Sequence, residues 1–403
     1  MLSAASAPIV AATLPLVRSH GEQITGNFYP RMFRAHPELL NVFNRGNQAT
    51  GEQKQALAGA VVAYAGHLLG ESTMPWHPIL ERIAHKHVSL GITPAQYTIV
   101  GRHLLDAVAE VLGPAVTPEI AAAWDEVYWL FACELIAREA RLYHDAGIGD
   151  PVDLWRTWRV IDRVTETADV FSLVLAPTDD GPVPAFVPGQ YVSVAVDLGA
   201  DRGQQIRQYS LSGAPQAGTW RITVKRLGPE GDRPAGTVSG HLHDRVGVGD
   251  TLRLSPPVGD IDAVAGTGPL LLVSAGIGVT PAMAALEHLV VHDPKRPVTL
   301  VHADRSPDAH PLRRHLPRLL GELPNLMVQL WYEDPMTALA PVPVNVGRVD
   351  AEQIPLDEPA QVHICGPLPF MRYVRSGLLR RGVPTERIAV EVFGPDLLRA
   401  GTA

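Results

Sequence analysis

Apolar residues recur at helical spacing along the first third of this 403-residue chain. Within residues 120–143, Trp124, Val127, Phe131 and Leu135 follow one another at steps of three or four residues. This spacing places the four side chains on one face of a helix. Similar stretches before it predict a series of packed helices.

Capping residues mark the boundaries of these helices. Thr93-Pro94-Ala95-Gln96 combines an N-cap threonine, a proline in the first turn and a glutamine that can close a capping box. Thr117-Pro118 begins the next helix in the same way, and Gly91 ends the helix before both. Pro8, after Ser6, suits a first helical position. We therefore expect an all-α domain over residues 1–147.

Beyond a linker at Gly149-Asp150-Pro151, the pattern changes to short runs of alternating apolar and polar residues, separated by Gly, Pro and Asp. The runs are Arg159–Val164, Val170–Leu175, Tyr191–Val196, Trp220–Arg226 and Thr251–Leu254. Short alternating strands are typical of an antiparallel β-barrel. We expect this barrel over residues 148–264.

From Pro269 the apolar runs become continuous, as in parallel strands that are buried on both faces. They are Leu270–Val273, Val298–Val301, Met327–Leu330, Val362–Cys365 and Ile388–Val392, with helical segments between most of them. This alternation predicts a doubly wound α/β domain over residues 265–403. The chain is thus expected to be a multidomain protein.

Composition narrows the classes of partner and compartment. Hydrophobic residues make up 46% of the chain and charged residues 19%, as in soluble globular proteins. The net charge of −8 argues against nucleic acid or an anionic membrane as a partner. Leu2–Val17 is apolar but lacks a basic region before it, so we expect a helix there, and no run is long enough to span a membrane. Two cysteines, Cys133 and Cys365, form no disulfide framework, which fits a reducing cytoplasm.

The candidate chemistry of the helical domain centres on His87, which shares a helix face with Ile83. Tyr97 opens the next helix, and Glu139 lies one turn after Leu135 on the inward side of the last helix. A buried carboxylate needs a partner, and a Glu–Tyr–His chain would satisfy all three groups while orienting the imidazole as a metal ligand. The alternatives are a core histidine without a ligand and a solvated Glu139.

In the barrel, Arg207-Gln208-Tyr209-Ser210 supplies groups that suit a planar, phosphorylated cofactor. The guanidinium can bind a phosphate, the phenol ring can pack on a flat face, and the hydroxyl can bind a ring edge. An ordinary strand with a surface arginine is the alternative. Together with Pro188–Tyr191 and Gly236–Ser239, the segment resembles the FAD-binding part of the ferredoxin–NADP reductase superfamily.

The α/β region carries a candidate phosphate-binding turn. Gly276-Ile277-Gly278-Val279-Thr280-Pro281 follows a predicted strand and precedes a helix, so its glycines allow close approach of a phosphate to the backbone. A tight turn without a ligand is the alternative. Cys365-Gly366-Pro367 ends another strand at the same edge of the sheet.

The helical domain resembles a bacterial haemoglobin domain. The matching segments are Phe28-Tyr29-x-Arg31-Met32-Phe33, Phe43-Asn44-x-x-Asn47-Gln48, Gln53, Lys86-His87, Gln96-Tyr97 and Arg138-Glu139. With the reductase region behind it, the whole chain resembles flavohaemoglobin, the family of nitric oxide dioxygenases.

This resemblance implies a set of site residues. In the helical domain it implies His87 as the proximal ligand of haem b, Tyr97 and Glu139 as its hydrogen-bonded relay, Tyr29 as the distal hydroxyl that holds dioxygen, Phe43, Gln53 and Leu57 as distal-pocket residues, and Lys86 as a group that tunes redox potentials. For FAD it implies Tyr191, Arg207, Gln208, Tyr209, Ser210, Gly236, Val238 and Ser239. For NAD(P)H it implies Gly276, Ile277, Gly278, Val279, Thr280, Pro281, Cys365, Gly366 and Pro367. At the C-terminus it implies Glu391 as a redox-tuning group, and Val392, Phe393, Gly394 and Pro395 over the other face of the flavin.

The sequence departs from the family pattern in places. Residues 74–78 form a slightly longer segment than usual, which can alter the outer edge of the haem pocket. Val392 stands where many relatives carry Cys, and Val279 varies the glycine motif. Asp304 and Arg305, near a strand end, are candidates of opposite sign for the choice between NADH and NADPH, so that choice stays open.

The resemblance implies a nitric oxide dioxygenase that passes electrons from NAD(P)H through FAD to haem and oxidises nitric oxide with dioxygen to nitrate. We expect it to be a monomer in the cytoplasm. One rival is a dioxygen-binding or sensing globin whose attached reductase keeps the iron ferrous. Another is an NAD(P)H:acceptor reductase with a vestigial globin domain. An electron-donating Tyr97–Glu139 relay argues against the first rival, because simple carriage does not need it.

Overall fold

The computed structural model describes residues 1–43, 52–71, 76–199, 202–215, 218–229, 231, 234–335, 342, 344–356 and 359–393, without the side chains of residues 52–56. These residues form two compact units. One is built on residues 1–154, with which residues 195–206 group, and the other is built on residues 155–194 and 207–393.

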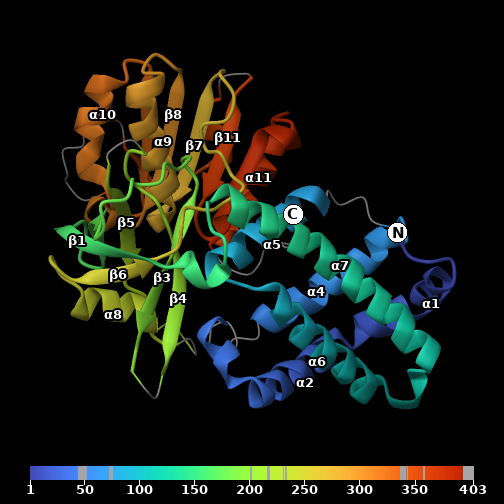
Figure 1. The fold of residues 1–403 in the computed structure, drawn as a ribbon. Helices are drawn as coiled ribbons and strands as arrows, with labels where there is room; N and C mark the ends of the chain where they lie inside the picture. The colour runs from blue at the N-terminus through green and yellow to red at the C-terminus, as the bar shows by residue number, and fades with distance from the viewer. Residues whose placement is uncertain are drawn as a thin grey trace. The chain divides into compact units, whose positions relative to one another are not determined.

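The first unit is helical, as the sequence predicts (Figure 1). Its α-helices are α1 (Ser6–Ser19), α2 (Gly21–Ala35), α4 (Glu52–Leu68), α5 (Trp76–Leu90), α6 (Pro94–Leu112) and α7 (Pro118–Asp145). Short 3₁₀ turns η1 (Pro37–Asn41), η2 (Gly113–Ala115) and η3 (Pro151–Leu154) connect or follow them. One expectation needs correction, because α1 begins at Ser6 and Pro8 therefore lies inside its first turn.

Local signals fix these helices and aromatic side chains pack them. The backbone N–H of Thr93 donates to the Gln96 side chain over 2.9 Å, which confirms that side of the predicted capping box. Thr117 caps α7 by accepting from the N–H of Ile120. Gly101 lets α6 and α7 approach, since a Cβ at this position would lie 2.3 Å from the Tyr128 ring.

The second unit begins with an antiparallel sheet. Its strands are β1 (Arg156–Thr165), β2 (Val170–Pro177), β3 (Tyr191–Asp197), β4 (Gln204–Ser210), β5 (Trp220–Lys225) and β6 (Thr251–Leu254), in the order β4-β3-β6-β1-β2-β5. Leu211, just after β4, bridges Ile222 on β5 and so joins the two outer strands. This closure confirms the predicted barrel. The rings of Trp158 and Trp220, both buried, stack at 3.7 Å in its interior.

The rest of the second unit is a parallel sheet with helices on both faces. Its strands are β7 (Leu270–Ala275), β8 (Val298–Asp304), β9 (Leu326–Tyr332), β10 (Val344–Val346), β11 (Gln361–Cys365) and β12 (Ile388–Glu391), in the order β10-β9-β8-β7-β11-β12. Leu270 and Leu272 pack with α9 (Val279–His292) and α10 (Leu316–Glu322), whereas Leu271 and Val273 pack with α11 (Leu368–Arg380) (Figure 1). The predicted doubly wound domain is therefore present, with β10 as an edge strand that the sequence pattern did not reveal.

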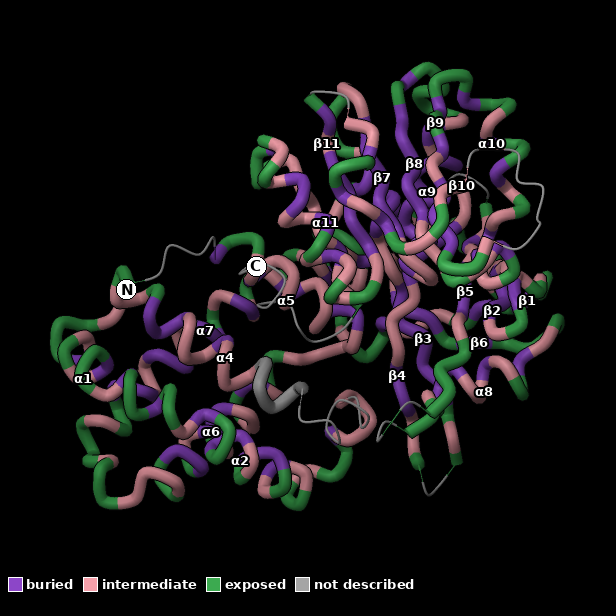
Figure 2. The backbone as a smooth tube through the Cα atoms, turned by 180° about the vertical axis from the view of Figure 1, so that it is seen from behind, coloured by how far each residue is buried: buried purple, intermediate pink, exposed green. Residues whose placement is uncertain are grey.

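Burial follows the periodicities of the sequence. The central strands β7, β8 and β11 are buried along most of their length, and so is α9, whereas α2, α5 and α7 are buried on one side (Figure 2). The order of the parallel strands reverses between β7 and β11, and such a switch point opens a crevice at the carboxyl ends of the strands. Within the described residues, the structure contains no helix that is both long and apolar enough to cross a bilayer.

Candidate functional site

Three predicted residues of the helical unit meet through hydrogen bonds. His87 Nδ1 lies 2.7 Å from Glu139 Oε1 and 2.8 Å from the Tyr97 hydroxyl oxygen, and that hydroxyl donates to Glu139 Oε1 over 2.5 Å. Only 2% of Glu139 is exposed, so the carboxylate depends on these two partners. The structure therefore brings together the Glu–Tyr–His chain that helical spacing suggested.

Neighbouring contacts hold the chain in place. The Tyr128 hydroxyl on α7 donates to the carbonyl of Tyr97 over 2.5 Å, and the Tyr143 hydroxyl donates to the carbonyl of Ile92 over 2.9 Å. Gly91 ends α5 with φ +75, a conformation that favours glycine. The C-terminal end of α5, the start of α6 and the C-terminal half of α7 are thus fixed together, and each contributes one residue of the His87–Tyr97–Glu139 chain.

The electrostatics define which imidazole nitrogen is available. Burial, followed by the charge of Glu139, raises the pKa of Tyr97, so the phenol keeps its proton and donates it. A carboxylate can only accept, so His87 Nδ1 carries the hydrogen between them. In a neutral imidazole that donates through Nδ1, Nε2 holds the lone pair, which is the form that binds a metal ion. About 30% of the His87 side chain is exposed, and this arrangement fits an imidazole that would hold haem iron.

Tyr29 lies in an aromatic cluster of the same unit. It is 3% exposed on α2, and its ring centroid lies 4.7 Å from Phe28, 5.8 Å from Phe33 and 5.9 Å from Phe43. Phe43 and Leu57 both pack against the helical core. The side chain of Gln53 lies outside the described residues, as do Asn44, Asn47 and Gln48.

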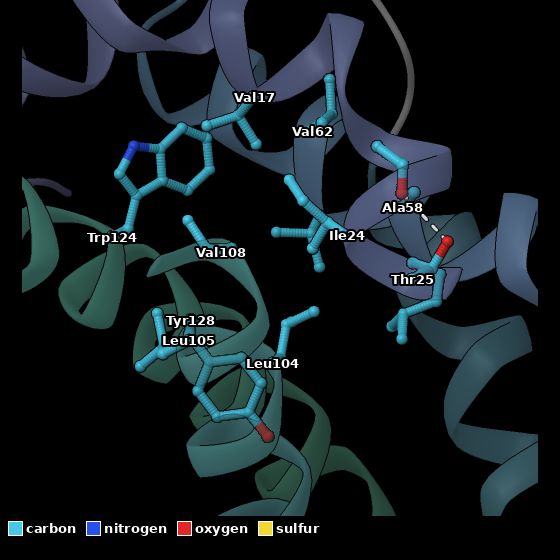
Figure 3. Close-up of a pocket in the computed structure, with 13 residues that line it drawn as sticks. Val17, Ile24, Thr25, Ala58, Val62, Leu104, Leu105, Val108, Trp124 and Tyr128 are labelled. Carbon is cyan, nitrogen blue, oxygen red and sulfur yellow. Dashed lines mark hydrogen bonds between the residues drawn. The ribbon is translucent and has the colours of Figure 1, made fainter. Parts of the chain in front are cut away.

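An apolar cavity of about 30 Å³ lies inside the helical unit (Figure 3). Side chains from α1, α2, α4, α6 and α7 line it, including Leu57. The polar groups of its lining residues bond elsewhere: the Thr25 hydroxyl to the Gly21 carbonyl, the Tyr128 hydroxyl to the Tyr97 carbonyl and the indole N–H of Trp124 to Thr13. The cavity therefore offers a small molecule an apolar surface.

Lys86 precedes His87 on α5 and is half-buried. Burial lowers the pKa of its ammonium group to about 8. A cation whose charge is this sensitive to its surroundings is compatible with the redox-tuning role that the resemblance implies.

The predicted flavin segment forms the end of β4 in the second unit. Burial lowers the pKa of the Arg207 guanidinium and raises the pKa of the Tyr209 phenol, so the first stays a cation and the second stays neutral near pH 7. Gln208 donates to the Ser193 hydroxyl over 3.1 Å. Tyr191 bridges Val258 at the start of β3. These groups hold a cation, a ring and a hydroxyl along one strand end, which fits a phosphorylated ring cofactor.

The next predicted segment opens a helix, as expected. Gly236 is the N-cap of α8 (Thr237–Arg245), and Val238 and Ser239 lie buried in its first turn. A Cβ at Gly236 would lie 2.6 Å from the Ser239 hydroxyl oxygen, which explains the glycine. The N-terminal amides of this helix fit the predicted binding of a pyrophosphate.

The two predicted nicotinamide segments lie side by side at the switch point of the parallel sheet. Gly276-Ile277-Gly278 forms the 3₁₀ turn η4 after β7, and Val279, Thr280 and Pro281 begin α9. A Cβ at Gly278 would lie 2.5 Å from the carbonyl oxygen of Cys365, so the two strand ends can approach only with glycine here. Gly366 is similarly crowded, with Ala275 and Phe370 beside it, and Pro367 caps α11.

Glu391, at the end of β12, joins the flavin segment to the parallel sheet. Its Oε1 accepts a hydrogen bond of 3.0 Å from the Ser210 hydroxyl, and His363 Nε2 donates to its Oε2 over 3.2 Å. Sequence reasoning did not identify His363, although its alternation with Cys365 on β11 could have placed both on one face. Val392 is half-buried and Phe393 is 49% exposed, while Gly394 and Pro395 lie outside the described residues.

Asp304 and Arg305 differ in exposure. The Asp304 side chain is 6% exposed with Oδ2 3.6 Å from His302 Nε2, whereas the Arg305 side chain is 68% exposed and lies 3.8 Å from Asp169. The buried side chain of the pair is thus the acidic one.

Comparisons with known proteins agree with this division of the chain. Residues 26–135 match the globin family, and residues 272–376 match the oxidoreductase NAD-binding domain. A flavohemoprotein from Bordetella parapertussis is 44% identical and covers 98% of this chain and 99% of the relative. A flavohemoprotein from Rhizobium meliloti is 42% identical over the same shares.

Solved structures give the same result. The crystal structure of flavohemoglobin from Malassezia yamatoensis, with bound FAD and heme, has a TM-score of 0.85 and 34% identity, over 98% of this chain and 100% of that one. The flavohem-like FAD/NAD binding domain of nitric oxide dioxygenase from Vibrio cholerae has a TM-score of 0.55 and 39% identity. It covers 60% of this chain and 99% of that domain.

Proposed function

Because this chain belongs to the flavohemoprotein family, we propose that it is an NAD(P)H-dependent nitric oxide dioxygenase with haem b and FAD as cofactors. Its substrates are nitric oxide and dioxygen, and its product is nitrate. Electrons pass from NAD(P)H through FAD to haem.

The observation that carries the proposal is the buried His87–Tyr97–Glu139 chain. Haem, when bound, supplies the iron at which dioxygen reacts with nitric oxide. His87 would hold that iron through Nε2, and Glu139 would make the imidazole more basic by accepting its Nδ1 hydrogen. A more basic imidazole favours negative charge on dioxygen. Oxidation of nitric oxide requires this charge, whereas reversible binding of dioxygen does not.

Tyr29 is the distal residue of the proposal. Its hydroxyl would donate a hydrogen bond to the dioxygen substrate and stabilise the negative charge that develops there. Phe28, Phe33 and Phe43 surround its ring and restrict the directions in which the hydroxyl can point. Leu57 and Gln53 complete the proposed distal pocket.

The second unit supplies the electrons. FAD, when bound, would supply a group able to exchange two electrons with a nicotinamide and one with an iron centre. Arg207 and the amides of α8 would bind its phosphates, while Tyr209 and Ser210 would hold its ring system. Gly276–Pro281 and Cys365–Pro367 would bind the nicotinamide nucleotide, since both segments end parallel strands at the switch point.

Replacement of the distal hydroxyl tests the proposal. Tyr29→Phe should weaken dioxygen retention and lower nitrate production by about tenfold or more, because removal of a donor to developing charge costs at least this much. Anaerobic reduction of the flavin by NADH should stay intact. Tyr64→Phe is the matched control, since Tyr64 is also buried on a helix of this unit but bonds to Glu134. Undiminished nitrate production by the Tyr29 variant would contradict the distal assignment.

A dioxygen-binding or sensing globin with an attached reductase remains the second candidate. It predicts tight, reversible dioxygen binding beside slow turnover of nitric oxide. One anaerobic spectrum with NADH, then air, then nitric oxide separates the two. The dioxygenase should lose its oxygenated spectrum rapidly on the last addition, and the carrier should lose it slowly.

We also propose domain boundaries at residues 1–147, 148–264 and 265–403, and a monomer in the cytoplasm. The capped end of α7 near residue 145 and the buried strand β7 after residue 269 support the boundaries. Both cysteines are free, one exposed and one buried, which suits a reducing compartment.

A further inference from the structure

A buried hydrogen-bonded chain in the second unit runs from Ser210 through Glu391 to His363. The Ser210 hydroxyl donates to Glu391 Oε1, and His363 Nε2 donates to Glu391 Oε2. The exposed fractions are 8% for Ser210, 6% for Glu391 and 2% for His363. Both carboxylate oxygens are therefore held by side chains, one from the barrel and one from the parallel sheet.

The strand register explains why His363 can reach this carboxylate. Glu391 on β12 pairs with Cys365 on β11, and His363 pairs with Ala389 two residues earlier on each strand. Residues two apart on a strand point to the same face. His363 therefore lies behind the carboxylate, on the side away from the strand ends.

Burial makes this contact matter energetically. Among the ion pairs of the described residues, Glu391 has a single partner that can carry positive charge, and it is His363. A buried carboxylate that loses its partners either takes up a proton or turns toward water. Without His363, Glu391 Oε2 would lose its hydrogen bond, and the orientation of the carboxylate toward Ser210 would no longer be fixed from the sheet side.

The other titratable groups on this face do not take over the role of His363. Burial, followed by the charge of Glu391, raises the pKa of Cys365 well above its usual value, so this thiol stays neutral. His302 on β8 bonds through Nδ1 to Ser274, the β7 residue paired with Cys365. Its contacts thus run along β7 and β8 and away from β12.

We propose that His363 is a positioning residue of the reductase centre: it holds the Glu391 carboxylate in its orientation, and acts on the flavin only through Glu391 and Ser210. This inference rests on the proposed function, because that function places Ser210 at the flavin ring. A fixed negative charge near the ring opposes formation of the anionic reduced flavin, so the pair keeps the flavin midpoint potential low.

A double-mutant cycle on the full-length holoprotein tests this inference. His363→Leu removes the donor, Glu391→Gln removes the charge, and the flavin midpoint potential is measured by anaerobic reductive titration without NADH. Each single variant should raise the potential, and the double variant should match Glu391→Gln alone, because a residue that acts through another adds nothing once that other is gone. The limiting rate of flavin reduction by NADH should fall roughly tenfold or more in His363→Leu.

Further variants separate positioning from support of the fold. His363→Gln keeps a side-chain N–H donor and should stay close to wild type, whereas the shorter His363→Asn should behave like His363→Leu and replaces it if the leucine variant does not fold. His302→Leu is the matched control, since it also removes a buried histidine from the parallel sheet. It should lower the melting temperature without changing the flavin potential.

The outcomes are distinct. An unchanged potential in His363→Leu, or shifts that add in the double variant, would overturn the positioning role. The titration involves neither nitric oxide nor dioxygen, so these results do not depend on the haem reaction. Wild-type protein without bound FAD would instead refute the proposed function, and this inference with it.

Discussion

Glu139→Gln is the sharpest test of the helical unit, because it changes charge while keeping size. Glu139 Oε1 accepts from His87 Nδ1 over 2.7 Å and from the Tyr97 hydroxyl over 2.5 Å. A glutamine oxygen at this position can still accept both bonds. The variant therefore removes the negative charge behind the imidazole and leaves the geometry nearly intact.

The magnitude follows from the difference between charged and neutral hydrogen bonds. A bond to an ionised acceptor is stronger by about 1 kcal/mol than a neutral one, so loss of charge assistance at two bonds costs about 1–2 kcal/mol. The variant would destabilise ferric haem by this amount relative to ferrous haem, because the ferric form carries more positive charge. For a one-electron couple, it raises the haem midpoint potential by about 40–90 mV.

Spectroelectrochemical titration of the haem band measures this shift directly. Nitrate production should fall by about tenfold or more, as for other groups that orient metal ligands. Glu134→Gln is the matched control, because Glu134 lies on the same helix, is 44% exposed and bonds to Tyr64 and Arg138. If Glu139→Gln took up haem normally and kept the wild-type potential, an electron-donating role for this chain would be refuted.

Three other substitutions test the second unit. Gly278→Ala would place a Cβ 2.5 Å from the Cys365 carbonyl oxygen. We therefore expect the free energy of unfolding to fall by about 1–3 kcal/mol and stopped-flow flavin reduction to show weaker NADH binding. A normal affinity for NADH would contradict the role of the two nicotinamide segments. Arg296→Met removes guanidinium hydrogen bonds of 2.7, 2.6 and 2.9 Å to three backbone carbonyls. Denaturant unfolding should show a loss of about 3 kcal/mol in the free energy of unfolding, and a loss below about 1 kcal/mol would contradict this structural role. Burial and nearby guanidinium groups lower the pKa of His315 from 6.5 to about 4, so unfolded chain binds a proton in this window that folded chain does not. The free energy of unfolding should therefore fall by about 1–2 kcal/mol as pH drops from 6.5 to 4. His315→Gln should make this fall smaller, whereas His292→Gln, at an exposed histidine, should leave it unchanged. Equal pH dependence of stability in the two variants would contradict the assignment to His315.

Several features could be predicted because they depend on neighbours in sequence. The capping residues of α6 and α7 lie within a turn of the amides that they satisfy, so Thr93 and Thr117 marked these helix starts. Strand periodicity separated the alternating barrel from the continuous parallel strands. Burial alternates as expected in β6, whereas β2 and β3 are buried along most of their length.

Other features were missed because local pattern carries no sign of them. The edge strand Val344–Val346 is too short to show a period. His363 lies in an apolar run, where a histidine with a ligand role and a histidine in a core look alike. Its importance comes from Glu391, which stands 28 residues later in the chain.

The sequence by itself determined the order of the folds and the chemical types available to each site. It placed His87 on an apolar helix face and glycines after a buried strand. Only the tertiary structure decided which polar groups meet. The two partners of Glu139 stand 42 and 52 residues before it, and Ser210 stands 181 residues before Glu391. His363 is nearer in sequence, 28 residues before Glu391. The physical reason is that a buried carboxylate must be satisfied by whichever donors the packing of distant elements brings within hydrogen-bonding distance.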